Sequence, residues 1–146
     1  MSRVYISSSY RNISAIRLLT KILKEAGHCV LDWTPRAMPP SGLTPSERRT
    51  WLDTSAREET FAFCSSACAS VDVVIYLGAS GQDAGVEVGM AWTAGVPVLG
   101  VAGPFEKPGP MLSEAVSAWV TMDDLLEDPV HFSSLLVTAS QRGIEC

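Results

Sequence analysis

Short apolar segments alternate along the chain with segments in which apolar residues recur at helical spacing. Each short segment predicts a strand, because the strands of a covered parallel sheet read as nearly continuous apolar runs. The intervening amphipathic segments predict helices. The predicted strands are residues 4–8, 29–33, 71–77, 96–101 and 119–121, and the predicted helices are 12–26, 44–69, 84–94 and 111–117, with further helical segments toward the C-terminus.

Helix-boundary residues support these assignments. Asn12 is a suitable N-cap for the first helix, and Gly27 follows its end as a C′ residue should. The run Thr-Pro-Ser-Glu at 44–47 predicts a capping box with proline in the first helical position. From it we expect one continuous helix to about Ala69, and we expect Asp83 to cap the helix that begins at 84.

Strand–helix alternation with buried strands predicts an α/β fold. We expect a single domain, residues 1–146, built as a three-layer sandwich around a five-stranded, mainly parallel sheet in the order 2-1-3-4-5. Ligands of such folds bind beyond the carboxyl ends of the strands at the switch point, here between the first and third strands. The loops 7–12 and 78–85 therefore become the candidates for function.

Composition excludes several classes of protein. The chain has 146 residues, of which 47% are hydrophobic, and a net charge of −5, so disorder is excluded. Its 11 Lys and Arg against 16 Asp and Glu argue against a basic face for nucleic acid. No apolar run approaches the roughly 20 residues of a membrane span, and the N-terminus lacks a signal-peptide pattern. We expect a cytoplasmic protein with neither nucleic acid nor membrane as partner.

The cysteines indicate packing rather than chemistry. Cys29, Cys64, Cys68 and Cys146 have no histidines at metal-ligand spacing. Small buried residues in a reducing compartment are the simpler interpretation. We expect no metal and no cofactor.

The first loop carries groups that suit a phosphate or a sugar. Ser7, Ser9, Tyr10 and Arg11 offer hydroxyls, a guanidinium and backbone N–H groups that enter a helix. The loop lacks the glycines and lysine of a phosphate-binding Walker loop. The alternative is a serine-rich turn in which Asn12 caps the helix.

The second loop leads into a helix that places one carboxylate, Glu87, among apolar residues: Val86, Val88, Met90, Ala91 and Trp92. A helix that is apolar all round is buried all round, and a carboxylate there is paired or functional. An ionised carboxylate at a switch point suits a nucleophile for an electrophilic carbon. The alternative is that Glu87 only complements the positive helix N-terminus.

Four segments together resemble the nucleoside 2-deoxyribosyltransferase family, which includes the 2′-deoxynucleoside 5′-phosphate N-hydrolases. They are residues 4–12, the Gly-His-x-Val at 27–30, the Asp-Val-Val at 72–74 and Gly-Val-Glu-Val-Gly-Met-Ala at 85–91. The resemblance implies that Glu87 attacks the anomeric carbon and forms a glycosyl-enzyme intermediate. It also implies that Tyr5 lies at the floor of the site and that Ser113 contacts the 5′-phosphate bound to a neighbouring subunit.

The sequence departs from this pattern at Cys64, where the family usually has an aspartate that assists the leaving base. On a continuous helix, Asp53 would share the face of Cys64. Asp53 from one side or Asp83 from the other are the candidate replacements. Alternatively, no acid exists and the protein binds without efficient catalysis.

Other candidate contacts with substrate are less specific. Trp33, before a Pro-rich loop, is placed either to stack on a base or to pack in the core. Ser80 and Gly85 belong to the second loop and are candidate substrate contacts.

The favoured function is cleavage or transfer of the N-glycosidic bond of a nucleoside or nucleotide. The alternatives are a catalytically weak nucleotide-binding module and a hydrolase of another N-riboside such as NAD. Because only one face of the Glu87 helix can pack on its own sheet, we expect a homo-oligomer, at least a dimer, that covers the other face. The competing explanation is that Phe132, Leu135 and Leu136 of the C-terminal segments cover it.

Overall fold

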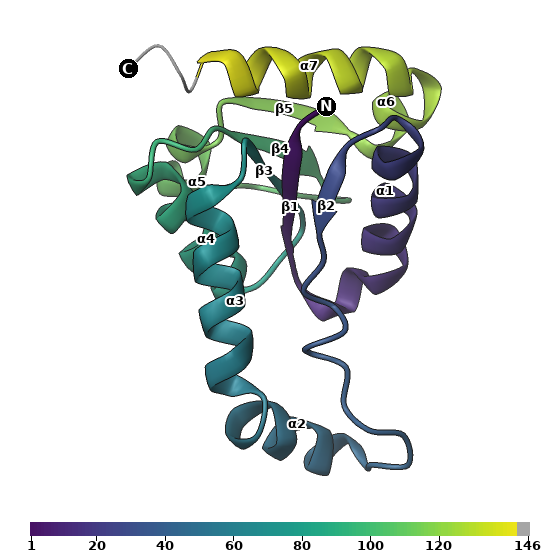
Figure 1. Ribbon diagram of the computed structural model, residues 1–146, viewed down its shortest axis with the longest axis vertical. Helices are drawn as coiled ribbons and strands as arrows, with labels where there is room; N and C mark the ends of the chain where they lie inside the picture. Colours follow the sequence, from purple (N-terminus) through teal and green to yellow (C-terminus); the bar gives the residue numbers. More distant parts are fainter. Residues whose placement is uncertain (143–146) are drawn as a thin grey trace.

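The computed structural model describes residues 1–142 and contains the expected α/β fold (Figure 1). Its sheet has five strands, all parallel, in the order β2-β1-β3-β4-β5. They are β1 (Arg3–Ser8), β2 (Cys29–Leu31), β3 (Val73–Leu77), β4 (Val98–Ala102) and β5 (Ala118–Thr121). The predicted fold class and strand order are confirmed.

Helices cover both faces of this sheet (Figure 1). Helix α4 packs on β1, β3 and β4 and has α3 and α5 beside it, whereas α1 and α7 cover the opposite face. The helical elements are η1 (Tyr10–Asn12), α1 (Ile13–Glu25), α2 (Pro45–Thr54), α3 (Arg57–Ser70), α4 (Gln82–Thr93), α5 (Pro110–Ala115), α6 (Met122–Glu127) and α7 (Pro129–Arg142).

The prediction of one continuous helix over 44–69 is wrong. The capping box at Thr44 and Glu47 forms as expected, but the helix ends at Thr54 and α3 begins at Arg57. Helix α2 buries none of its residues, whereas Ala56 at the break is only 5% exposed. The chain therefore turns to bury Ala56, and α2 lies beyond the carboxyl ends of the strands (Figure 1).

Two predicted caps also differ in the structure. Asn12 stands at the N-cap position of α1, but its side chain makes no capping hydrogen bond. Gly81 is the N-cap of α4, and Asp83 lies inside the first turn. Gly27 does end α1, with a φ of 86° that favours glycine.

Strand boundaries shift by one or two residues. Because β2 ends at Leu31, Trp33 lies in the turn that follows it. Asp72 precedes β3 and accepts a hydrogen bond from the Arg3 N–H at the amino ends of the strands. That position agrees with the expectation that Asp72 faces away from the switch point.

The cysteines follow the packing interpretation only in part. Cys64 and Cys68 are buried in α3, but Cys29 is exposed, so the expectation is wrong for Cys29. Cys146 lies outside the described residues. Among residues 1–142, no group of three or more His, Cys, Asp or Glu side chains is arranged to hold a metal ion. In the same part of the chain, no helix combines the length and apolar character of a membrane span.

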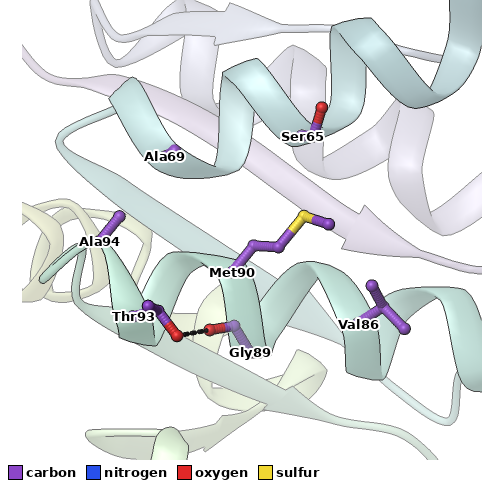
Figure 2. A pocket seen from close by; sticks show the side chains of 7 residues that line it. All are labelled: Ser65, Ala69, Val86, Gly89, Met90, Thr93 and Ala94. Carbon is purple, nitrogen blue, oxygen red and sulfur yellow. Dashed lines mark hydrogen bonds between the residues drawn. The ribbon is translucent and has the colours of Figure 1, made fainter.

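The outer side of α4 is apolar and uncovered within the chain. Val86 is 54% and Trp92 62% exposed, and an open groove runs between α3 and α4 along Met90 and Gly89 (Figure 2). The C-terminal helix instead packs on β3 and β4. The explanation that this helix covers the outer side of α4 is therefore wrong.

Candidate active site

Glu87 belongs to α4 and points its carboxylate toward β1, where two hydroxyl groups hold it. Tyr5 and Ser7 are two residues apart in β1, so their side chains point to the same face of the sheet. The Tyr5 hydroxyl donates to Oε1 of Glu87 at 2.7 Å, and the Ser7 hydroxyl lies 2.6 Å from Oε2. Both carboxylate oxygens are therefore held in place at the switch point between β1 and β3.

Two opposed effects set the charge state of Glu87. Burial raises its pKa above the usual value, and the nearby charge of Asp83 acts in the same direction. The hydrogen bonds from Ser7 and Tyr5 lower the pKa, because they stabilise the charged form. Burial is the largest effect, so the pKa of Glu87 is raised overall.

The Tyr5 phenol remains a donor throughout. Burial and the neighbouring Glu87 charge raise the pKa of Tyr5 far above its ordinary value. A phenol that does not ionise keeps its proton for the Glu87 oxygen. Tyr5 therefore orients the carboxylate and does not act as a base.

Cys64 reaches the same site from α3. Its thiol is close enough to Glu87 to help lower the pKa of that carboxyl, and it also interacts with Tyr5. Burial raises the pKa of the Cys64 thiol to about 12. Position 64 therefore holds a neutral thiol beside Glu87, where the resemblance predicts an aspartate.

Hydrogen bonds join the two candidate loops, 7–12 and 78–85, to each other. The Ser80 hydroxyl donates to the Leu77 carbonyl at 2.7 Å and accepts from the Ser9 N–H at 2.9 Å. The Asn12 amide donates to the Ser8 hydroxyl at 3.0 Å and to the Ala79 carbonyl at 3.1 Å. The Asn12 side chain thus joins the loops instead of capping α1, which is why the predicted cap is absent.

A second group of hydrogen bonds joins β3 to the loop after β4, and sequence reasoning missed it. The Tyr76 hydroxyl donates to Oε1 of Glu106 at 3.0 Å and accepts from the Ser80 N–H at 3.2 Å. A side chain at Gly78 would overlap the Glu106 carboxylate, so this approach requires glycine. The alternation of β1 and β3 puts Tyr76 on the face of Ser7, its pairing partner, and that register was the available signal.

The remaining candidates of the first loop, Tyr10 and Arg11, are exposed at the protein surface. Tyr10 is 42% exposed, and its ring centroid lies 6.5 Å from that of Trp33. The Arg11 guanidinium is exposed and its Nε donates to the Ser9 hydroxyl at 3.3 Å. Trp33 is only 7% exposed, and its indole N–H donates to the Ile6 carbonyl, so it packs in the core, as the alternative interpretation holds.

The other candidates are spread more widely. Asp53 is exposed on α2 and pairs with Arg49 at 3.0 Å, and the break at 55–56 removes the argument that placed it on the face of Cys64. Asp83 and Gly85 are exposed in the first turns of α4. Ser113 is exposed on α5.

Comparison with known proteins finds similarity in structure only. No family model matches the chain. No curated protein matches its sequence either. A 2-deoxyribosyltransferase from Bacillus psychrosaccharolyticus is similar with a TM-score of 0.61 at 16% identity, over 86% of this chain and 90% of that one.

Two further solved structures are similar. The CMP N-glycosidase of Clostridium botulinum has a TM-score of 0.56 at 14% identity, over 83% of this chain and 89% of its own. A conserved protein from Enterococcus faecalis has a TM-score of 0.54 at 15% identity, over 97% and 99% of the two chains. The chain therefore shares the fold of these proteins, and the resemblance seen in the sequence is confirmed at the level of the fold.

Proposed function

We propose that this protein cleaves or transfers the N-glycosidic bond of a nucleoside or nucleotide, with Glu87 as the nucleophile. The observation that carries the proposal is the partly buried Glu87 carboxylate, which accepts hydrogen bonds on both oxygens from Tyr5 and Ser7. A 2-deoxyribosyltransferase and a CMP N-glycosidase share this fold, which supports this class of reaction.

In the proposed first step, a Glu87 oxygen forms a bond to the anomeric carbon of the sugar. The bond from that carbon to the base breaks, and its electron pair leaves with the base. Tyr5 and Ser7 hold the carboxylate at a fixed angle, which favours attack by reducing the orientational cost. Water or a second base then displaces Glu87 and regenerates the carboxylate.

The departing base carries negative charge that the site must offset. Among the carboxyl candidates, Asp83 is favoured over Asp53, because the charge of Asp83 acts on Glu87 while Asp53 is engaged with Arg49. Asp83 would then be the group that passes a proton to the departing base.

The rim of the first loop would hold the sugar and any phosphate. Ser9 and Arg11 supply a hydroxyl and a positive charge beside the start of η1 and α1, the chemistry that suits an anion. Ser80 and Gly85 border the same opening from the second loop. Tyr10, exposed beside Trp33, offers a ring face for stacking.

We also propose that the active form is a homo-oligomer. The uncovered apolar residues of α4, Val86 and Trp92, support a second subunit on this side, and Ser113 on the adjacent α5 would then approach the partner's site. Light scattering at micromolar concentration tests this, and a mass of 15.7 kDa, that of one chain, would contradict it.

The function is tested by incubating the protein with a panel of ribonucleosides, deoxyribonucleosides, their monophosphates and NAD. Release of free base, followed by chromatography, is the expected result, and addition of a second base distinguishes transfer from hydrolysis. Release of nicotinamide alone would favour the hydrolase of another N-riboside instead.

A second candidate function is a nucleotide-binding module with little catalysis. The neutral Cys64 thiol beside Glu87 favours it, because a thiol whose pKa is about 12 is a poor proton donor for a leaving base. Saturable binding of nucleotides without base release would select this function.

A further inference from the structure

Arg36 brings a positive charge to the carboxyl ends of the strands from the Pro-rich loop that follows β2. The Arg36 backbone N–H donates to the Trp33 carbonyl at 3.0 Å. The Trp33 indole N–H in turn donates to the Ile6 carbonyl at 2.9 Å. The turn is therefore anchored to β1 at the residue that precedes Ser7, which puts Arg36 at the same end of the strands as Glu87.

The Arg36 guanidinium is stacked on α3. Its central carbon lies 3.8 Å from the centroid of the Phe63 ring, and its Nε lies 3.8 Å from an oxygen of Glu59. Glu59 is 77% exposed, so this ion pair holds the guanidinium weakly. Stacking on the ring leaves the planar N–H groups available to a ligand.

The neighbouring face of α3, which carries Thr60 and Cys64, is turned toward Glu87. Cys64 follows Phe63 and contacts both Tyr5 and Glu87, and the positive charge of Arg36 lowers the pKa of the Cys64 thiol against the effect of burial. One helical turn before Cys64, the Thr60 hydroxyl oxygen is buried without a hydrogen-bond partner. A cation and an unpartnered hydroxyl therefore lie around Cys64, the α3 residue that contacts Glu87.

We propose that the Arg36 guanidinium stabilises the negative charge that develops on the departing base, and that the Thr60 hydroxyl hydrogen-bonds the same base. The proposal rests on the proposed function. As Glu87 bonds to the anomeric carbon, the electron pair of the broken bond passes to the base, which leaves as an anion beside the guanidinium. The anion then takes up a proton from Asp83 or from water, and Arg36 keeps its own proton.

This assignment gives position 36 the task that a neutral thiol at position 64 does not perform. A guanidinium stays charged at all physiological pH values, so it offsets the developing charge without needing a proton at the right moment. Its paired N–H donors also match a carbonyl oxygen beside a ring nitrogen, as in arginine recognition of guanine. The expected substrates are therefore nucleosides of oxo bases, in preference to adenine, which has no carbonyl.

The test compares leaving groups that do and do not need this help. The probes are the best nucleoside substrate and a nitrophenyl glycoside of the same sugar, whose leaving group is a stable anion. Arg36→Gln should lower kcat on the nucleoside about 100-fold or more, as for the loss of one donor to a developing anion. On the nitrophenyl glycoside the same variant should lose less than about tenfold, because that anion needs little stabilisation. Arg36→Lys keeps the charge but not the fork, and should fall between Arg36→Gln and the wild-type protein.

Two variants serve as controls. Arg17→Gln removes one exposed positive charge from α1, on the opposite face of the sheet, and should leave both rates within about threefold of wild type. Glu59→Gln removes the surface partner of Arg36 and should also leave both rates within about threefold. Circular dichroism and the melting temperature establish that each variant is folded.

The outcomes separate this proposal from the proposed function. If Arg36→Gln lowers kcat equally on the nucleoside and on the nitrophenyl glycoside, the role proposed for Arg36 is wrong while glycosidic cleavage stands. The same conclusion follows if the wild-type protein prefers adenosine-type substrates. If the folded wild-type protein releases neither base nor nitrophenol from any substrate, the proposed function fails and the role of Arg36 fails with it. A selective loss on the nucleoside supports both.

Discussion

The carboxyl ends and the amino ends of the parallel strands, called here the two edges of the sheet, each shield one titratable side chain from water. The partners of those two side chains differ. At the carboxyl edge, Glu87 is held by the hydroxyls of Tyr5 and Ser7. At the amino edge, His28 is 6% exposed, accepts the Ser2 N–H on Nδ1 at 3.3 Å and bonds the Ser133 hydroxyl through Nε2. Burial penalises the charged form in both cases, raising the pKa of Glu87 and lowering that of His28.

The partners decide what each edge can do. Donors to a carboxylate stabilise its charged form, so Glu87 is kept available for reaction despite its burial. An N–H that donates to Nδ1 requires that nitrogen to be unprotonated, so His28 is held neutral and joins β1, the end of α1 and α7. Shielding from water thus accompanies the proposed reaction at Glu87 and a structural role at His28.

The largest effect should come from Glu87→Gln. The amide keeps the shape of the side chain but is a poor nucleophile, so kcat should fall by about a thousandfold or more. Substrate binding, measured by calorimetry, should persist. Turnover within a few-fold of wild type would contradict covalent catalysis by Glu87.

The same variant should not lose stability. Because the folded state raises the pKa of Glu87, it binds the proton more tightly than the unfolded state, and this group's contribution to stability falls as pH rises above about 4.5. At neutral pH the neutral amide should therefore melt at the same temperature as wild type or higher. A markedly lower melting temperature would show that the carboxylate is structural.

The next effect should come from Tyr5→Phe. Removing this hydrogen bond raises the pKa of Glu87 further, because the bond stabilises the charged form. A hydrogen bond to a charged group is worth about 1.5–3 kcal/mol, so the acid limb of the kcat/KM profile should move up by about one pH unit or more. In wild type that limb should already lie above the ordinary glutamate value of 4.5. An unchanged acid limb in the variant would show that the Tyr5 hydrogen bond does not lower the pKa of Glu87.

A smaller effect on stability is expected at His28. Since the folded state lowers the pKa of His28, the unfolded state binds the proton first, and stability is lost as pH falls below the unfolded value of 6.5. The loss is at most about 1.4 kcal/mol per pH unit for one group. Comparing denaturant unfolding at about pH 7.5 and about pH 5.5, His28→Gln should show less of this loss than wild type. Equal pH dependence in the two proteins would contradict the buried neutral histidine.

The smallest effect should come from Asp72→Asn at the amino edge. Asp72 accepts the Arg3 N–H at 2.6 Å but is exposed, so water replaces the contact at little cost. We expect a loss of about 1 kcal/mol or less and no change in turnover. A change in kcat would mean that the two edges are coupled.

The local sequence determined the strands, most of the helices and the place of Glu87, the proposed nucleophile. Apolar runs predicted all five strands, because buried parallel strands leave a pattern that needs no knowledge of their neighbours, and the rule of right-handed crossovers predicted their order. A carboxylate among apolar residues marked Glu87, since burial of a charge is visible in the pattern of one helix. Tyr5 followed from the family resemblance, whereas Ser7, expected in the loop as a substrate contact, is buried in β1 and bonds Glu87.

Only the tertiary structure decided how the site is supported. The break at Ala56 depends on what that residue packs against, so the helix over 44–69 was misjudged and Asp53 lost the position assigned to it. Asn12 bonds the neighbouring loop in preference to its own helix, because the two loops meet only after the sheet forms. Arg36 lies in a turn without periodicity, and its stacking on Phe63 joins segments that are distant in sequence and adjacent only in the fold.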